Sequence, residues 1–92
     1  MSGGHFGNYD YYKVSQFADE LESEIDNNGK EDEYGYANNY SQETIEYLNQ
    51  QLPKLRKMAE IMRIIDYLYS GDIGDNNFFK RIQEIEDKYK DT

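Results

Sequence analysis

The chain has 92 residues, enough for one small domain, of which 37% are hydrophobic and 32% charged, with a formal net charge of -9. It contains no cysteine, which excludes disulfides, thiolate metal sites and cysteine nucleophiles. No apolar run approaches the roughly 20 residues that a membrane-spanning helix needs, and the opening residues lack the pattern of a secretory signal.

The chain opens with a polar, glycine-rich segment. Residues 1–9 hold three glycines and an asparagine, too much backbone freedom for a stable helix, so they are predicted to form a flexible arm before a single helical domain over residues 10–92. The following apolar residues recur at helical spacing and predict a first helix over residues 10–26, with the stop signal Asn27-Asn28-Gly29 behind it. Its apolar face comprises Val14, Phe17, Ala18, Leu21 and Ile25.

Residues 30–40 follow neither a helical nor a strand period and are predicted to form an acidic loop. Ser41 is then a good N-cap for a second helix over residues 42–69. Its apolar residues stay in phase across Pro53, which favours one kinked helix over two helices. They are Ile45, Leu48, Leu52, Leu55, Met58, Ala59, Met62, Ile65 and Tyr69.

The second helix would be about 42 Å long, more than either neighbouring helix can cover. We therefore expect a homo-oligomer in which a second copy covers the rest. The turn Asp72-Ile73-Gly74-Asp75 predicts the start of a third helix, with Asp72 or Asp75 as its N-cap. No segment alternates as a strand does, so the fold class is predicted as all-α with three helices. The third apolar face comprises Phe78, Phe79, Ile82, Ile85 and Tyr89.

Metal and catalytic sites are poorly supported. His5 is the only histidine, and a calcium loop over residues 24–35 fails because its last position is Gly35 where a bidentate Glu is required. With no cysteine, no phosphate-binding glycine loop and one histidine in the arm, we expect neither an enzyme nor a cofactor.

Charge is unevenly distributed along the chain. Nine acids face two lysines between Asp10 and Glu33. Direct binding of DNA or RNA through a basic surface is disfavoured by the total charge, because phosphate contacts require Lys and Arg. The acids are either a solvated helix surface or a surface that binds a basic partner. The acidic face proposed for a partner comprises Asp19, Glu20, Glu22, Glu24, Asp26, Glu31, Asp32 and Glu33.

Tyrosine is the most abundant aromatic residue. Ten tyrosines exceed what one small core can bury, and tyrosine is enriched in recognition surfaces because it offers a large contact area with few rotatable bonds. Some tyrosines should therefore contact a partner, although they could equally complete the edge of the core and hold the loop.

Several segments resemble a known family. The opening Met1-Ser2-Gly3-Gly4-His5-Phe6, the helix start Tyr40-Ser41-x-Glu43-Thr44-Ile45 and the helix end Ile64-Ile65-Asp66-Tyr67-Leu68-x-Ser70-Gly71-Asp72 are similar to small uncharacterised proteins encoded by bacteriophages and prophages. Here Gly7-Asn8-Tyr9 stands where that family has Asp-Tyr, and Tyr67 where it has Trp. The resemblance implies a location in the cytoplasm of a bacterial host; it carries over no functional residue.

Three functions remain open. The first is a phage accessory protein that binds and inhibits a host defence protein, with its acids imitating nucleic acid phosphates. The second is an oligomer that sequesters a nucleotide immune signal, and the third is a structural or regulatory phage protein whose dimer is its function. In the second, cations hold phosphate and aromatic residues stack on the base. Those residues are Phe6, Tyr9, Tyr11, Tyr12, Lys54, Arg56, Lys57 and Arg63.

Overall fold

The protein is all-helical, as predicted. A computed structural model describes residues 11–31, 33–35 and 38–91. It contains α1 (Tyr11–Asp26), α2 (Gln42–Tyr69) and α3 (Asp75–Lys88), and no strand occurs in these ranges. The arm predicted over residues 1–9, with Phe6 and Tyr9, and also Asp32 and the side chain of Tyr11, lie outside what is described.

The connection between α1 and α2 is closed at its base by Asn28. The backbone N–H of Tyr40 donates to Asn28 Oδ1 at 3.0 Å, and Asn28 Nδ2 donates to the carbonyl oxygen of Tyr40 at 3.2 Å. Beside this pair, the N–H of Gly29 donates to the carbonyl oxygen of Asn38 at 2.6 Å. Gly29 has a φ of +82°, a conformation that favours glycine and explains why α1 stops at this point. The ends of the two helices are therefore held together at the base of the loop.

The second helix has the predicted bounds. Ser41 caps it, and its side chain accepts a hydrogen bond from the backbone N–H of Thr44 at 3.3 Å. The helix continues through Pro53 without a break, so the prediction of one helix instead of two is confirmed. It ends before Gly71, which has a φ of +80°.

The start of α3 differs from the prediction. Gly74 is its N-cap, with extended backbone and no side-chain hydrogen bond, so the choice of Asp72 or Asp75 was wrong. Asp75 is already the first helical residue, where its carboxylate still favours the positive end of the helix dipole.

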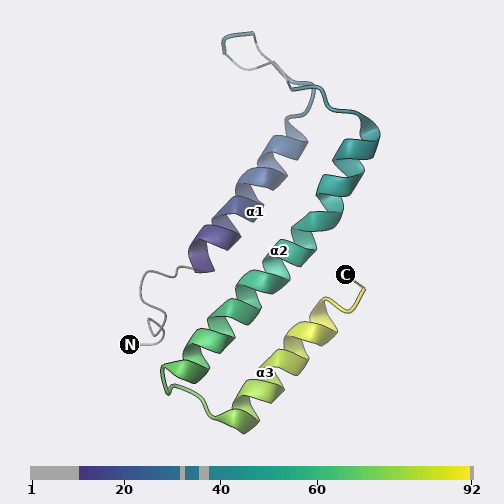
Figure 1. Ribbon diagram of the computed structural model, residues 1–92. Coiled ribbons are helices and arrows are strands. Elements are labelled where there is room, and N and C mark those ends of the chain that lie inside the picture. The colour runs from purple at the N-terminus through teal and green to yellow at the C-terminus, as the bar shows by residue number, and fades with distance from the viewer. Residues whose placement is uncertain (1–10, 32, 36–37, 92) are drawn as a thin grey trace.

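The three helices form one layer. Figure 1 shows α1 and α3 on the two sides of α2, and each packs on α2 and not on the other. The molecule measures 52 × 30 × 13 Å. Its radius of gyration is 17.0 Å, whereas a compact domain of this length has a radius of gyration of about 12 Å. Both broad surfaces of the layer are therefore left without a covering element among the described residues.

The core is correspondingly small. Its buried apolar residues are Ala18, Ala59, Ile64 and Ile85, and no large side chain in the described ranges is completely buried. The sequence missed Ile64. It assigned Phe17, Met58, Tyr69 and Phe79 to the apolar faces, whereas all four are more than half exposed. The reason is geometric, because α2 is contacted from its two sides and the predicted stripe runs between them.

Candidate functional site

The first feature that joins elements is an ion-pair cluster between α1 and α2. Arg56 Nη1 lies 2.8 Å from Asp19 Oδ1, and Arg56 Nη2 lies 3.2 Å from Glu22 Oε1. The hydrogen bond to Asp19 raises the pKa of Arg56. Two residues of the predicted acidic face are thus turned towards α2, and their charge is partly neutralised there.

The other described acids of the predicted acidic face have a different environment. They are exposed and form no ion pair within the described ranges; Glu20 accepts a hydrogen bond from Gln16 at 3.4 Å. We call them the unpaired acids. Because Glu20 and Glu24 are one turn apart, they present two negative charges to solvent on the same side of α1. The unpaired acids are Glu20, Glu24, Asp26, Glu31 and Glu33.

Exposed tyrosines accompany the unpaired acids. Tyr34, beside Glu33, is 76% exposed, and Tyr40 at the base of the loop is 54% exposed. Tyr67 and Tyr89, by contrast, are half-buried against other helices. Some of the described tyrosines are therefore exposed to solvent, whereas Tyr67 and Tyr89 lie at the edge of the core.

A second cluster holds α3 against α2. Glu60 accepts hydrogen bonds from Lys88 Nζ at 3.0 and 3.1 Å and from the hydroxyl of Tyr89. Partial burial opposes the charge of Glu60, but these two donors outweigh it, so the pKa of Glu60 is lowered. Burial and the bond to Glu60 raise the pKa of Tyr89. Nearby, Lys57 Nζ lies 2.7 Å from Glu86 Oε1, which gives Lys57 a structural role between the helices.

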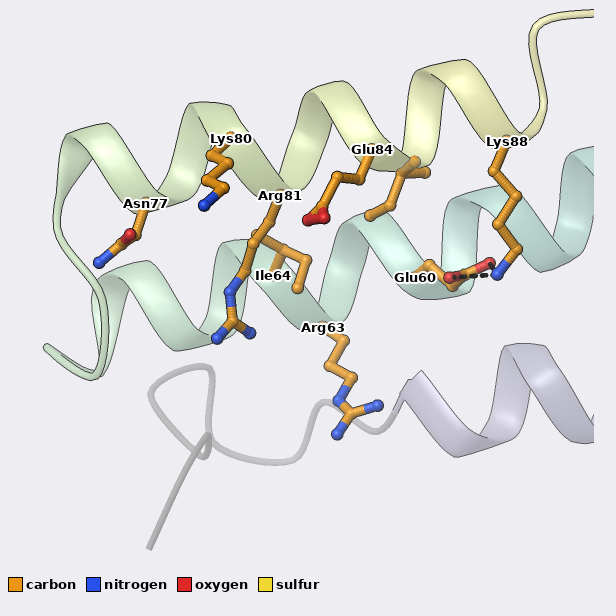
Figure 2. Close-up of a pocket in the computed structure, with 9 residues that line it drawn as sticks. Glu60, Arg63, Ile64, Asn77, Lys80, Arg81, Glu84 and Lys88 are labelled. Carbon is orange, nitrogen blue, oxygen red and sulfur yellow. Dashed lines mark hydrogen bonds and ion pairs between the residues drawn. The ribbon is translucent and has the colours of Figure 1, made fainter.

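A groove of about 550 Å³ runs between α2 and α3 (Figure 2). Its rim carries more positive than negative side chains, although the whole chain is strongly acidic. Figure 2 shows the guanidinium groups of Arg63 and Arg81 pointing the same way, while Glu84 points towards α2. The lining residues are Glu60, Arg63, Ile64, Asn77, Lys80, Arg81, Glu84, Ile85 and Lys88.

Tyr67 connects the two arginines of the groove. Arg63 Nε donates to the Tyr67 hydroxyl at 2.6 Å, and the Arg63 guanidinium carbon lies 5.3 Å from the ring centroid. Arg81 reaches across from α3 to 6.0 Å from the same centroid. Two cations from different helices are thus held around one aromatic ring by hydrogen bonding and cation–π contact.

The structure separates the cations that the sequence grouped as a phosphate site. Arg56 contacts α1, Lys57 contacts α3, Lys54 is exposed, and only Arg63 lines the groove. Tyr12 is exposed on α1. Lys80, Arg81 and Tyr67 were missed as site residues, although the pair Lys80-Arg81 and the i, i+4 spacing of Arg63 and Tyr67 were visible in the sequence.

No other site chemistry emerges from the described residues. They contain no group of three or more His, Asp or Glu side chains that could hold a metal ion. None of their helices is long and apolar enough to cross a membrane. Comparison with protein-family models, curated proteins and solved structures finds no match to this chain.

Proposed function

We propose that the protein acts by binding and not by catalysis, as a phage accessory protein that inhibits a host defence protein in the bacterial cytoplasm. The contact surface is formed by α1 and the loop that follows it. The observation that carries this proposal is the set of unpaired acids, because the chain's paired cations are used between helices and leave these carboxylates to solvent.

The chemistry of this surface suits a basic partner. Exposed carboxylates imitate the phosphates of a nucleic acid and attract a basic groove over long range. The exposed rings of Tyr34 and Tyr40 add contact area at low entropic cost. The surface therefore supplies both steering charge and anchoring groups, the combination that a small inhibitor needs.

The test is capture of host proteins from bacterial lysate by the tagged chain at low and high salt. We expect a stoichiometric partner that is lost at high salt, since exposed charges are screened. The double variant Glu20→Gln/Glu24→Gln should weaken capture. The matched control Asp87→Asn/Asp91→Asn changes the net charge equally at the far end of α3 and should not. Equal capture by both variants, or binding that salt does not weaken, would contradict the proposal.

A second candidate function is sequestration of a nucleotide signal, and the groove between α2 and α3 favours it. Arg63 and Arg81 offer guanidinium groups for phosphate, and Lys80 adds a third cation at the rim. Thermal shift with cyclic and ADP-ribose-type nucleotides tests this function. Arg81→Gln should abolish a stabilising shift, whereas Glu84→Gln should enlarge it by removing a competing carboxylate. No shift with any nucleotide would remove this candidate.

We also propose that the working form is a homo-oligomer. The single layer of helices supports this, because α2 is contacted on only two sides by described elements. If neither a host protein nor a nucleotide binds, the oligomer itself remains as the function, in a structural or regulatory role.

A further inference from the structure

The two broad surfaces of the helical layer differ in chemistry. One carries the ion pairs of Arg56 with α1, the pairs of Glu60 with α3, and the groove. We call this the charged face. The exposed Tyr12 stands seven positions before Asp19 and so lies on the charged side of α1. Five other large apolar side chains that remain at least half exposed lie on the opposite surface, which we call the apolar face. They are Phe17, Tyr47, Met58, Tyr69 and Phe79.

Helical geometry places these residues on one side of the layer. Two positions along a helix turn a side chain by about 200°, to nearly the opposite side. Phe17 stands two positions before Asp19, which contacts Arg56 on the charged face. Phe79 likewise stands two positions before Arg81, which lines the groove.

The same rule holds on the central helix. Met58 stands two positions from both Arg56 and Glu60, so it points away from both clusters of the charged face. Tyr47 and Tyr69 are each 11 residues from Met58, three full turns, and share its side of the helix. All three helices therefore contribute to one apolar face.

We propose that the apolar face is the interface of a symmetric homodimer in which the α2 helices of two copies pack antiparallel about a two-fold axis at Met58. This deepens the proposal of a homo-oligomer by naming its surface and symmetry. A second copy suits the face because Tyr47 and Tyr69 lie at equal distances along α2, 11 residues before and after Met58. With the axis at Met58, Tyr47 meets Tyr69 of the other copy, and Tyr69 meets Tyr47, as a two-fold interface requires.

Charge and area favour the same occupant. Within the row Tyr47, Gln51, Lys54, Met58, Met62, Ile65 and Tyr69, Lys54 is the only charged residue, and the symmetry places it opposite Met62 and not opposite itself. Face-to-face packing keeps the Arg56 and Glu60 clusters of both copies outside, so two acidic chains can associate without burying these clusters. Glu24 and Glu86, the latter paired with Lys57, stand on the side of the apolar face on the two outer helices.

The available area is also sufficient. A layer of 52 × 30 Å is broad enough for the roughly 800 Å² per partner of a standard interface. The chain exposes 7041 Å², compared with about 5,600 Å² for a compact folded protein of its mass. This surplus exceeds the area that a standard dimer interface would remove from one partner.

The first test is the molar mass in solution by light scattering and sedimentation. The natural chain should have twice its 10.9 kDa mass. Met58→Glu should shift it to the monomer while circular dichroism remains helical, because Met58 is 51% exposed in the single chain. Asn49→Glu adds the same charge on the opposite side of α2 and should leave the dimer intact. The molar mass should be measured over a concentration series that reaches about 1 mM, where even weak dimers form. A natural chain that stays monomeric over the whole series would overturn the proposal.

The second test fixes the symmetry, and it uses the absence of natural cysteine. Under mild oxidation Met58→Cys should link to itself. Tyr47→Cys and Tyr69→Cys should each link poorly alone but efficiently when mixed, because only the antiparallel arrangement brings them together. Asn49→Cys is the control for random collision. Efficient self-linking of Tyr47→Cys, or equal linking at Asn49, would contradict the assigned interface.

The dimer and the inhibitory surface can fail separately. Met58→Glu leaves the unpaired acids in place, so its capture of a host partner reports the acidic surface alone. Glu31→Gln/Glu33→Gln removes unpaired acids from the loop beyond α1 and leaves the apolar face in place, so its molar mass reports the dimer alone.

Discussion

Glu60 joins the end of α3 to α2 through two donors. It accepts hydrogen bonds from both Lys88 and Tyr89 at the end of α3, while the buried part of that helix is reduced to Ile85. A carboxylate that accepts hydrogen bonds from two donors is held more firmly than the carboxylate of a single exposed ion pair. This carboxylate therefore adds a polar contact to the small apolar contact between α3 and α2.

The pH dependence of this contact has a definite sign. The lowered pKa of Glu60 means that its charged form stabilises the fold; this contribution is complete above the ordinary value of 4.5 and is lost as the pH falls through the lowered pKa. Glu60→Gln should thus cost about 1 kcal/mol at neutral pH. The cost should vanish in strong acid, as measured by urea unfolding of both chains across pH 2–7. A cost that persists at low pH would show that shape, and not charge, matters at this position.

Among the helices, α2 shows how far the sequence could predict the fold. The apolar period and the stop signals predicted its bounds correctly and those of α1 to within one residue, because these signals are local. Burial was harder to predict. The period identifies a stripe but not the side from which neighbours approach, so Ile64 was missed and Met58 was assigned to the core. The groove was missed for the same reason, since Arg63 and Arg81 meet only after α3 has packed on α2.

Pro53 gives a prediction at the level of the helix. It lies inside α2, where proline removes one backbone hydrogen bond and costs roughly 3 kcal/mol relative to alanine. The unfolded chain with alanine has more conformational freedom than the chain with proline, which reduces the expected gain in stability by up to about 1 kcal/mol. Pro53→Ala should therefore stabilise the protein by about 2 kcal/mol in thermal and urea unfolding, with Gln50→Ala as a near-neutral control. Destabilisation by Pro53→Ala would indicate that a kink at this position is needed for packing.

The molecule as a whole is a single layer of helices, with the Arg56 and Glu60 clusters on one side and five large exposed apolar side chains on the other. A net charge of -9 is compatible with the proposed self-association, because the two proposed contacts depend on different forces, although Glu24 stands on the same side of α1 as Phe17. The proposed binding of a host partner by the acids would be electrostatic, whereas the proposed association through the apolar face would be hydrophobic.

Salt should therefore affect the two contacts in opposite directions. Raising the salt concentration from low ionic strength to 1 M should weaken partner binding but leave the dimer unchanged or tighten it, because screening reduces repulsion between two acidic chains. Sedimentation equilibrium of the protein alone measures the second effect. A dimer that dissociates with added salt would mean that ion pairs, and not the apolar face, hold it together.

The hydrogen bonds of Asn28 to the main chain of Tyr40 have a consequence for how this protein can change. These hydrogen bonds join the two ends of the loop without using residues from its interior. The packing of α1 on α2 therefore does not require a particular loop sequence. The entropy of closing a loop grows slowly with length, by about 0.6 kcal/mol for each doubling. The segment between these anchors is thus a natural point of insertion, where recognition sequences can be exchanged, lengthened or tagged while the helical layer stays the same.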